Sequence, residues 1–447
     1  MTENDNAYYQ VVTDTQDRAV LVGVDRARSD GMSIADDLEE LARLTQTAGP
    51  LVVATVTQRL DHPDARTFIG KGKVEEVARL AGEHDANLVI FDEELTPSQQ
   101  AALETLLPRV RVIDRTALIL EIFALHAISR EGRLQVELAR QEYILPRLRG
   151  MWGHLERERL GGGRGARFGA GESQLETDRR MARRRIAELR RELETVSRYR
   201  RTQRHARAAS GVYRVALVGY TNAGKSTLLN ALTDAGVLVA DKLFATLDAT
   251  TRRLELPEGR QITLTDTVGF INKLPHGLVE AFKSTLEEVR EADLQLHVVD
   301  ASSPHARTQI AAVNEVLHEI DASGRPQVLV YNKCDLVSQD ELMRLRASAP
   351  NAVFVSAKDR AGLDELLERI ANEASRTETT IDVLIPYTRG EVVQLLHERG
   401  HIISETHETS GTRLTVRVAE SDVGRLAPFR VDQPRENTPG DADLPEK

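Results

Sequence analysis

The sequence predicts a multidomain α/β protein, and three observations lead to this fold class. Short apolar runs alternate with amphipathic helical stretches in two separate segments, as in parallel sheets covered by helices. A long stretch without a strand pattern lies between these segments and predicts an α-helical hairpin. The length of 447 residues also exceeds what one ordinary core holds. We therefore expect an N-terminal parallel β/α domain, a long helical hairpin, a second domain with a mainly parallel sheet and helices on both faces, and a small C-terminal α+β domain.

The changes of pattern along the chain set the expected domain limits. A polar N-terminal tail is followed by four predicted domains and a C-terminal tail that is rich in Pro, Asp and Glu and is predicted to be disordered. The predicted segments are a tail at 1–18, the β/α domain at 19–114, the Arg-rich hairpin at 115–208, the second β/α domain at 209–376, the α+β domain at 377–431 and the disordered tail at 432–447.

Hydrophobic periodicity predicts the elements of the two outer domains. In the first domain the apolar runs 19–24, 51–56, 87–91 and 110–113 are predicted strands, and helices are expected at 33–44, at 73–83 and after Thr96 and Pro97. In the C-terminal domain we expect strands at 381–385 and 413–418 around a helix at 390–398.

Composition limits the environment in which the chain works. No apolar run approaches the roughly 20 residues that a membrane span needs. Residues 1–17 are polar and acidic, which argues against a signal or transit peptide. The single cysteine, Cys334, fits a reducing compartment. We therefore expect a cytoplasmic protein with no membrane span.

The net charge of −10 hides a basic segment between residues 130 and 207. A helix at about 172–205 carries many arginines, and a glycine-rich loop precedes it. Within this loop Arg164 and Arg167 are placed to contact a phosphate backbone, and Phe168 is placed to stack on a base. The segment predicts RNA binding; the alternative is an ordinary solvated helix face.

A phosphate-binding loop lies at the start of the second β/α domain. The apolar strand 214–218 runs into a G-x-x-x-x-G-K-S motif, and a helical stretch follows it, which is the context that a P-loop requires. Lys225 is expected to reach the β- and γ-phosphates and Ser226 to bind Mg²⁺. The predicted phosphate contacts are Gly219, Tyr220, Thr221, Asn222, Ala223, Gly224, Lys225, Ser226 and Thr227.

Two further segments are expected to sense the γ-phosphate. After the strand 262–264 comes a D-T-V-G motif, in which Asp266 is placed near Mg²⁺ and Gly269 can donate its N–H to the γ-phosphate. Thr267 and Val268 complete this motif. Between the motifs, Thr246 is the predicted hydroxyl that completes the Mg²⁺ shell, with Thr250 or Thr251 as the alternative. Thr246 and Gly269 are therefore the predicted catalytic residues, and Ser226 and Thr246 the predicted metal ligands.

A third group of motifs predicts that the base is guanine. The strand 327–331 delivers Asn332, Lys333 and Asp335, and a carboxylate at position 335 matches the guanine N1–H and exocyclic amine, which adenine lacks. Further on, a strand at 352–355 ends in a tripeptide where a backbone N–H can meet guanine O6. This tripeptide is Ser356, Ala357 and Lys358.

In this order the motifs resemble those of the translation-factor-related P-loop GTPases, and the resemblance implies a G domain that cycles between GTP and GDP. This chain departs from the Ras pattern at Phe270, where many GTPases have a water-orienting Gln. Intrinsic hydrolysis is therefore expected to be slow, with the missing group supplied by the chain, by a partner or by K⁺. Asn222 is a candidate for helping K⁺, and a plain turn residue is the alternative.

The whole chain from about residue 20 to about residue 430 resembles the HflX GTPase family. The resemblance is carried by the F-I-G-K-G-K motif at 68–73, by the glycine-rich loop that ends in G-E-S-Q-L-E-T-D at 171–178, and by the G-domain motifs. It implies a monomer that binds the large ribosomal subunit, reaches rRNA near the peptidyl-transferase centre and splits stalled or idle ribosomes under stress. An assembly checkpoint on the large subunit and an ATP-dependent RNA remodeller are the alternatives. The 70–73 loop is either a phosphate contact, to rRNA or to ATP, or an ordinary β-to-α turn.

Overall fold

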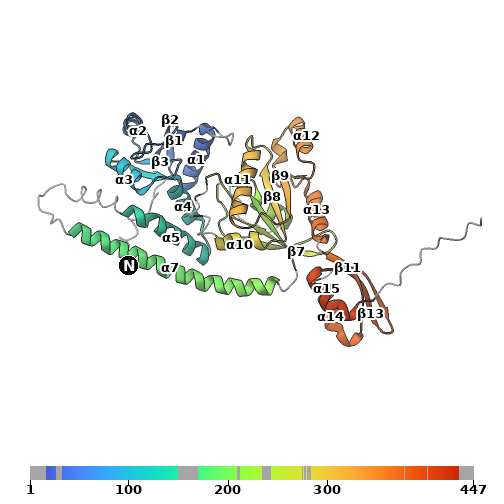
Figure 1. The fold of residues 1–447 in the computed structure, drawn as a ribbon. Coiled ribbons are helices and arrows are strands. Elements are labelled where there is room, and N and C mark those ends of the chain that lie inside the picture. Colours follow the sequence, from blue (N-terminus) through green and yellow to red (C-terminus); the bar gives the residue numbers. More distant parts are fainter. Residues whose placement is uncertain are drawn as a thin grey trace, which may run out of the picture. The chain divides into compact units, whose positions relative to one another are not determined.

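The computed structural model describes ten stretches of the chain: 17–26, 33–148, 170–208, 212–233, 243–273, 275, 278, 283–376, 378–399 and 401–431. The chain forms two compact units, one from 1–204, 214–252 and 264–363 and the other from 205–213, 253–263 and 364–447. Apart from Asp17 and Arg18, the two predicted tails lie outside the described residues. The predicted α/β fold class is confirmed, and Figure 1 shows its sheets and helices.

The N-terminal sheet is a four-stranded parallel sheet with strand order β2-β1-β3-β4. Alternate residues of β1 face opposite sides, so Ala19 and Leu21 belong to one apolar cluster while Val20 and Val22 belong to another. The strands are β1 (Arg18–Asp25), β2 (Leu51–Arg59), β3 (Leu88–Phe91) and β4 (Arg111–Asp114).

Helices cover both faces of this sheet (Figure 1). Helix α1 (Ile34–Ala48) packs on the Leu21 side, and α2 (Lys71–Glu83) and α3 (Pro97–Leu106) pack on the Val22 side. The start of α1 is fixed by a capping box between Ser33 and Asp36, and Thr96 caps α3 in the same way. The crossovers are therefore helices, as a parallel sheet requires.

The predicted helical hairpin differs from expectation in its first half. Instead of one long stretch from residue 115, the chain forms α4 (Arg115–His126), α5 (Arg130–Ile144) and a short 3₁₀ helix η2 (Leu145–Arg147). The helical stretch is first interrupted at residues 127–129, where Ser129 caps α5 and starts a new helix. Helix α4 is apolar nearly all round and lies in the core beside α1, whereas α5 and α7 (Ala170–Ala208) form the hairpin arms.

The second sheet has six strands in the order β10-β9-β8-β5-β7-β6, with parallel pairing at β5–β8, β8–β9 and β9–β10. Its elements, in chain order, are β5 (Tyr213–Gly219), α8 (Lys225–Thr233), β6 (Thr250–Glu255), β7 (Gln261–Asp266), α10 (Lys283–Glu291), β8 (Leu294–Asp300), α11 (Ala306–Glu319), β9 (Gln327–Asn332), η3 (Cys334–Leu336), α12 (Gln339–Ser348), β10 (Val353–Phe354) and α13 (Leu363–Ser375).

The C-terminal sheet is antiparallel with strand order β11-β13-β12. The strand β12 was not predicted, because its sequence H-I-I-S-E-T-H-E is mostly polar and exposed and carries no clear alternation. The elements of this domain are β11 (Glu378–Ile385), η4 (Tyr387–Arg389), α14 (Gly390–Arg399), β12 (His401–Glu408), β13 (Gly411–Ala419), α15 (Glu420–Leu426) and η5 (Ala427–Phe429).

Candidate nucleotide-binding site

The P-loop joins strand β5 to helix α8, as the sequence predicts. Gly219, Asn222 and Gly224 have positive φ angles of 151°, 60° and 91°, which turn the backbone into a tight loop. Lys225 is buried, and its Nζ donates to the carbonyls of Gly219, at 3.1 Å, and Tyr220, at 2.9 Å. Burial lowers the pKa of Lys225 to about 8, against the opposing influence of Asp266. A compact cationic loop therefore stands at the start of a helix, which suits polyphosphate binding.

Three oxygen-bearing side chains gather next to this loop. Ser226 Oγ lies 2.5 Å from Asp266 Oδ2 and 2.8 Å from Thr246 Oγ1, and Thr246 Oγ1 lies 3.2 Å from Asp266 Oδ2. Burial raises the pKa of Asp266, although Lys225 and the two hydroxyls lower it in part. Among the described residues, the buried Asp266 Oδ1 has no hydrogen-bond partner. Two hydroxyls and a carboxylate with an unused oxygen form a donor set that Mg²⁺ prefers.

The same geometry distinguishes between the candidate switch threonines. Thr246 lies with Ser226 and Asp266, whereas the hydroxyl of Thr251 pairs with that of Thr265 at 3.0 Å inside the sheet. Thr250 begins strand β6. The structure therefore places the Thr246 hydroxyl beside Ser226 and Asp266.

The D-T-V-G motif is joined to the P-loop through its backbone. The Thr221 N–H donates to the Phe270 carbonyl at 2.7 Å, and the Phe270 N–H donates to the Gly219 carbonyl at 3.1 Å. A Cβ at Gly269 would lie 2.9 Å from Thr221 Cα, so only glycine fits this approach. The Phe270 side chain is 1% exposed and belongs to the core, which removes it from any role in orienting water.

Not every residue of this motif faces the site. The Thr267 hydroxyl donates to the Leu217 carbonyl at 2.7 Å, and Val268 packs in the core. These contacts hold the end of strand β7 in place.

The predicted base-recognition residues form one hydrogen-bonded group. Asn332 Nδ2 donates to the Ala223 carbonyl and its Oδ1 accepts from the Ala357 N–H, both at 3.0 Å, so it links the P-loop to the S-A-K loop. The Ser356 hydroxyl donates to Asp335 Oδ1 at 2.7 Å and orients this carboxylate. The Ala357 N–H is therefore already hydrogen-bonded within the protein.

The two lysines of this group behave differently. Lys333 has a positive φ of 62° and pairs with Asp300 at 2.7 Å, which holds its stem in place. Lys358 is exposed. The predicted RNA contacts Arg164, Arg167 and Phe168 lie outside the described residues.

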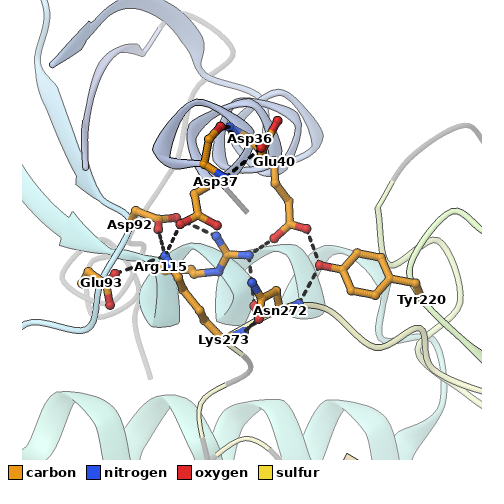
Figure 2. A network of polar contacts seen from close by, with 10 residues as sticks. Asp36, Asp37, Glu40, Asp92, Glu93, Arg115, Tyr220, Asn272 and Lys273 are labelled. Atoms are coloured by element: carbon orange, nitrogen blue, oxygen red, sulfur yellow. Dashed lines mark hydrogen bonds and ion pairs between the residues drawn. The ribbon is translucent and has the colours of Figure 1, made fainter. Parts of the chain in front are cut away.

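Sequence reasoning missed a charged network that ties the nucleotide loops to the N-terminal domain within the same compact unit (Figure 2). The P-loop residue Tyr220 turns its hydroxyl away from the phosphate loop, donates to Glu40 and accepts from the Asn272 N–H at 2.7 Å. Arg115, at the start of α4, pairs with Glu40 and donates to the Asn272 carbonyl at 3.1 Å. Just after the D-T-V-G motif, both backbone polar groups of Asn272 are therefore held, its N–H by Tyr220 and its carbonyl by Arg115.

Lys273 extends this network (Figure 2). Its Nζ contacts Asp92 and lies 2.9 Å from Asp37 and 3.1 Å from Glu93. Burial favours a higher pKa for Asp92, yet Arg115 and Lys273 together bring it below its ordinary value. The only trace in the sequence is an acidic stretch at 36–40 and a lysine after the motif, and pattern reasoning cannot pair positions more than 150 residues apart.

Two features are absent from the part of the chain that the structure describes. No helix there is long and apolar enough to cross a membrane. Nor does this part of the chain contain a cluster of three or more His, Cys, Asp and Glu side chains that could hold a metal ion.

The P-loop, the D-T-V-G motif and the N-K-x-D and S-A-K loops define a P-loop GTPase. Three family models match the chain: "GTP-binding GTPase N-terminal" over residues 35–124, "GTP-binding GTPase Middle Region" over 126–207 and "50S ribosome-binding GTPase" over 214–333.

The full-length similarities are to proteins named GTPase HflX. One from Caldanaerobacter subterraneus subsp. tengcongensis is 46% identical over 93% of this chain and 94% of its own length. One from Escherichia coli K12 is 42% identical over 92% and 96%. A GTP-binding protein from the archaeon Sulfolobus solfataricus, solved with GDP, is 25% identical, with a TM-score of 0.41 over 81% of this chain and 99% of that one. The chain belongs to the GTPase HflX family and is a GTP-binding GTPase.

Proposed function

We propose that this GTPase binds the large ribosomal subunit in its GTP state, separates stalled or idle ribosomes under stress and leaves after hydrolysis. One observation carries the proposal. A long arginine-rich helix, α7, belongs to the same compact unit as the nucleotide site, and that site matches a family model described as a 50S ribosome-binding GTPase. Arg180, Arg184 and Arg191 are exposed on α7, where they are available to RNA phosphates.

The hairpin is the proposed RNA-binding element, with Arg164, Arg167 and Phe168 at its tip as contacts to rRNA near the peptidyl-transferase centre. Backbone contacts from arginine need little sequence readout, so they suit a large structured RNA. In this proposal the protein acts as a monomer on the ribosome and works in the cytoplasm.

In the nucleotide site we assign GTP binding to the P-loop, to the D-T-V-G motif and to the group around Asn332 and Asp335. Ser226 and Thr246 are the proposed Mg²⁺ ligands, with Asp266 acting from behind them. When bound, Mg²⁺ neutralises charge on the β- and γ-phosphates. Asp335 accepts from guanine, Lys225 contacts the terminal phosphates, and Gly269 donates its N–H to the γ-phosphate.

Hydrolysis is proposed to be slow in the isolated protein, because the buried Phe270 offers no hydrogen bond to water. K⁺ near Asn222 or a group of the ribosome is proposed to take over the role of the water-orienting Gln. Comparing the turnover rate in K⁺ and in Na⁺, with and without ribosomes, separates these two sources.

Sucrose-gradient sedimentation of intact ribosomes tests the main proposal. We expect separate subunits, with the protein on the large one, after incubation with GTP or with the non-hydrolysable analogue GMPPNP. A variant with Arg180, Arg184 and Arg191 changed to Glu keeps its GDP affinity and loses this effect. Binding only to free large subunits favours the assembly checkpoint, and splitting with ATP alone favours the RNA remodeller; either result overturns the proposal.

A further inference from the structure

The segment that carries Thr246 is held by the N-terminal part of the same compact unit. Phe244 packs edge-on against Phe123 of α4, with ring centroids 4.8 Å apart and planes at 85°, and Leu247 is buried. Between these two anchors, Thr246 points to Ser226 and Asp266. The hydroxyl that faces Ser226 and Asp266 therefore lies between two apolar side chains that pack in the core.

Asp248 joins this segment to the start of α5 through hydrogen bonds. Its Oδ2 accepts the N–H of Ile128 at 2.9 Å and that of Ser129 at 2.6 Å, and its Oδ1 accepts the Ser129 hydroxyl. These groups lie at the start of α5, where unpaired N–H groups and the helix dipole favour a negative charge. Ser129 in turn caps the Gly132 N–H at 2.9 Å. A carboxylate from the switch segment thus completes the N-terminal cap of α5.

Gly132 leaves the space that this contact needs. A Cβ built at Gly132 would lie 2.5 Å from Asp248 Oδ1 and 3.3 Å from its Cγ. Glycine is unfavourable inside a helix, because it loses more conformational freedom on folding than other residues do. In α5 the missing side chain is what allows Asp248 to reach the backbone.

We propose that Asp248 is a positioning residue that couples GTP to the hairpin: the start of α5 holds Asp248, and Asp248 holds Thr246 in reach of Mg²⁺. Two residues of chain span at most about 7 Å, so fixing position 248 restricts where the Thr246 hydroxyl can go. The inference rests on the proposed role of Thr246 in the Mg²⁺·GTP site and does not depend on ribosome splitting.

The coupling runs in both directions and reaches the hairpin. A contact that favours the GTP-bound arrangement is itself strengthened by GTP, because linkage is reciprocal. Helix α5 then carries the effect to α7, since Glu137 pairs with Arg185 at 2.8 Å and Glu142 pairs with Arg190 at 2.7 Å. The hairpin that is proposed to bind RNA is therefore attached to the switch through one helix end.

The test is to measure GMPPNP and GDP affinities, with Mg²⁺ present, for Gly132→Ala, Asp248→Ala and Thr246→Ala. Gly132→Ala is informative because alanine favours the helix while its methyl displaces the Asp248 carboxylate. We expect Gly132→Ala and Asp248→Ala to bind GMPPNP about tenfold more weakly. GDP affinity stays unchanged, because Thr246 is needed only with the γ-phosphate. Gly82→Ala is the matched control, since a Cβ there meets nothing within 4 Å.

Hydrogen exchange gives a second readout that does not depend on affinity. In the wild type, the amides of Ile128 and Ser129 should exchange more slowly with GMPPNP than with GDP, and this difference should disappear in Gly132→Ala while Tm stays equal or rises. If Thr246→Ala weakens GMPPNP binding but the Gly132 and Asp248 variants do not, the positioning role is wrong and the metal site stands. If Thr246→Ala also has no effect, the proposed metal site fails.

Discussion

Two attachments join the nucleotide loops to the N-terminal elements, and they differ in burial and in charge. After the D-T-V-G motif, Lys273 and the buried Arg115 meet four carboxylates, and Figure 2 shows this cluster next to Asn272. On the Thr246 side, one partly exposed carboxylate, Asp248, caps a helix. Opening the first would leave buried charges unpaired, whereas water can replace the partners of the second. We therefore expect the Arg115–Lys273 network to be a permanent joint and the Asp248 contact to be a joint that can open.

The largest expected effect comes from breaking the permanent joint at Arg115. In Arg115→Met the buried Asp92 loses its 2.6 Å partner and Glu40 loses its cation. Removing one side of a buried ion pair costs about 3–5 kcal/mol of unfolding free energy. Urea unfolding at pH 7 measures this loss.

An exposed arginine on α1 provides the control for this substitution. Arg43 pairs with Glu39 at 2.6 Å, and both side chains are more than 60% exposed. Arg43→Met should therefore change the free energy of unfolding by less than about 0.5 kcal/mol. If Arg115→Met costs no more than this control, the network is not a permanent joint and the comparison is wrong.

Lys273 should show a smaller effect that depends on pH. Its side chain is 19% exposed, so water can in part replace it, and we expect Lys273→Met to cost about 2 kcal/mol at pH 7, below the range for a fully buried partner. The pKa of Asp92 is lowered in the folded protein, so its stabilisation is present above the unfolded value of about 3.9 and is lost as pH falls through the folded value.

The difference between Lys273→Met and the wild type should therefore shrink as pH falls from 6 to 3, because protonation of Asp92 removes the charge that Lys273 pairs with. Without Lys273 the folded pKa of Asp92 rises, so the variant loses less stability than the wild type as pH falls below the unfolded pKa of Asp92. Urea titrations at several pH values across this range measure the free energy of unfolding of the wild type and of Lys273→Met. Lys273→Arg is the control variant that keeps the charge. A difference that stays constant over the range would show that Asp92 is not the partner that matters.

How much the sequence could predict differs between these regions for a physical reason. The P-loop and the D-T-V-G motif are local: the phosphates require certain residue types at fixed spacing, so Lys225, Ser226 and Asp266 could be predicted from the chain alone as neighbours, and they do lie together. Arg115 and Asp248 act through partners 157 and 119 positions away, and no local rule places such pairs together. Only the packed fold brings them into contact.

The same limit explains the errors in the elements. The interruption between helices α4 and α5 depends on Ser129 and on Asp248 from a distant loop. Periodicity alone therefore predicted one continuous helical stretch. Strand β12 was missed because it has no apolar face that a sequence pattern could show. It is a strand because it pairs with β13. The alternation of strands and helices in both parallel sheets, by contrast, was predicted, because burial on two faces leaves a strong local pattern.

Tyr220 tests whether the two functions of one loop are separable, and it carries the smallest expected effect. Its backbone belongs to the P-loop, while its hydroxyl serves the permanent joint through Glu40 and Asn272. In Tyr220→Phe the ring keeps its place, Glu40 keeps Arg115, and the Asn272 N–H loses this acceptor, which should cost about 1 kcal/mol of unfolding free energy. GDP affinity should not change, because the phosphates meet the backbone of the loop.

Thermal unfolding and a GDP titration measure the two quantities on the same sample. A loss of GDP affinity that exceeds the loss of stability would show that the joint shapes the phosphate loop, and the two attachments would then be parts of one switch.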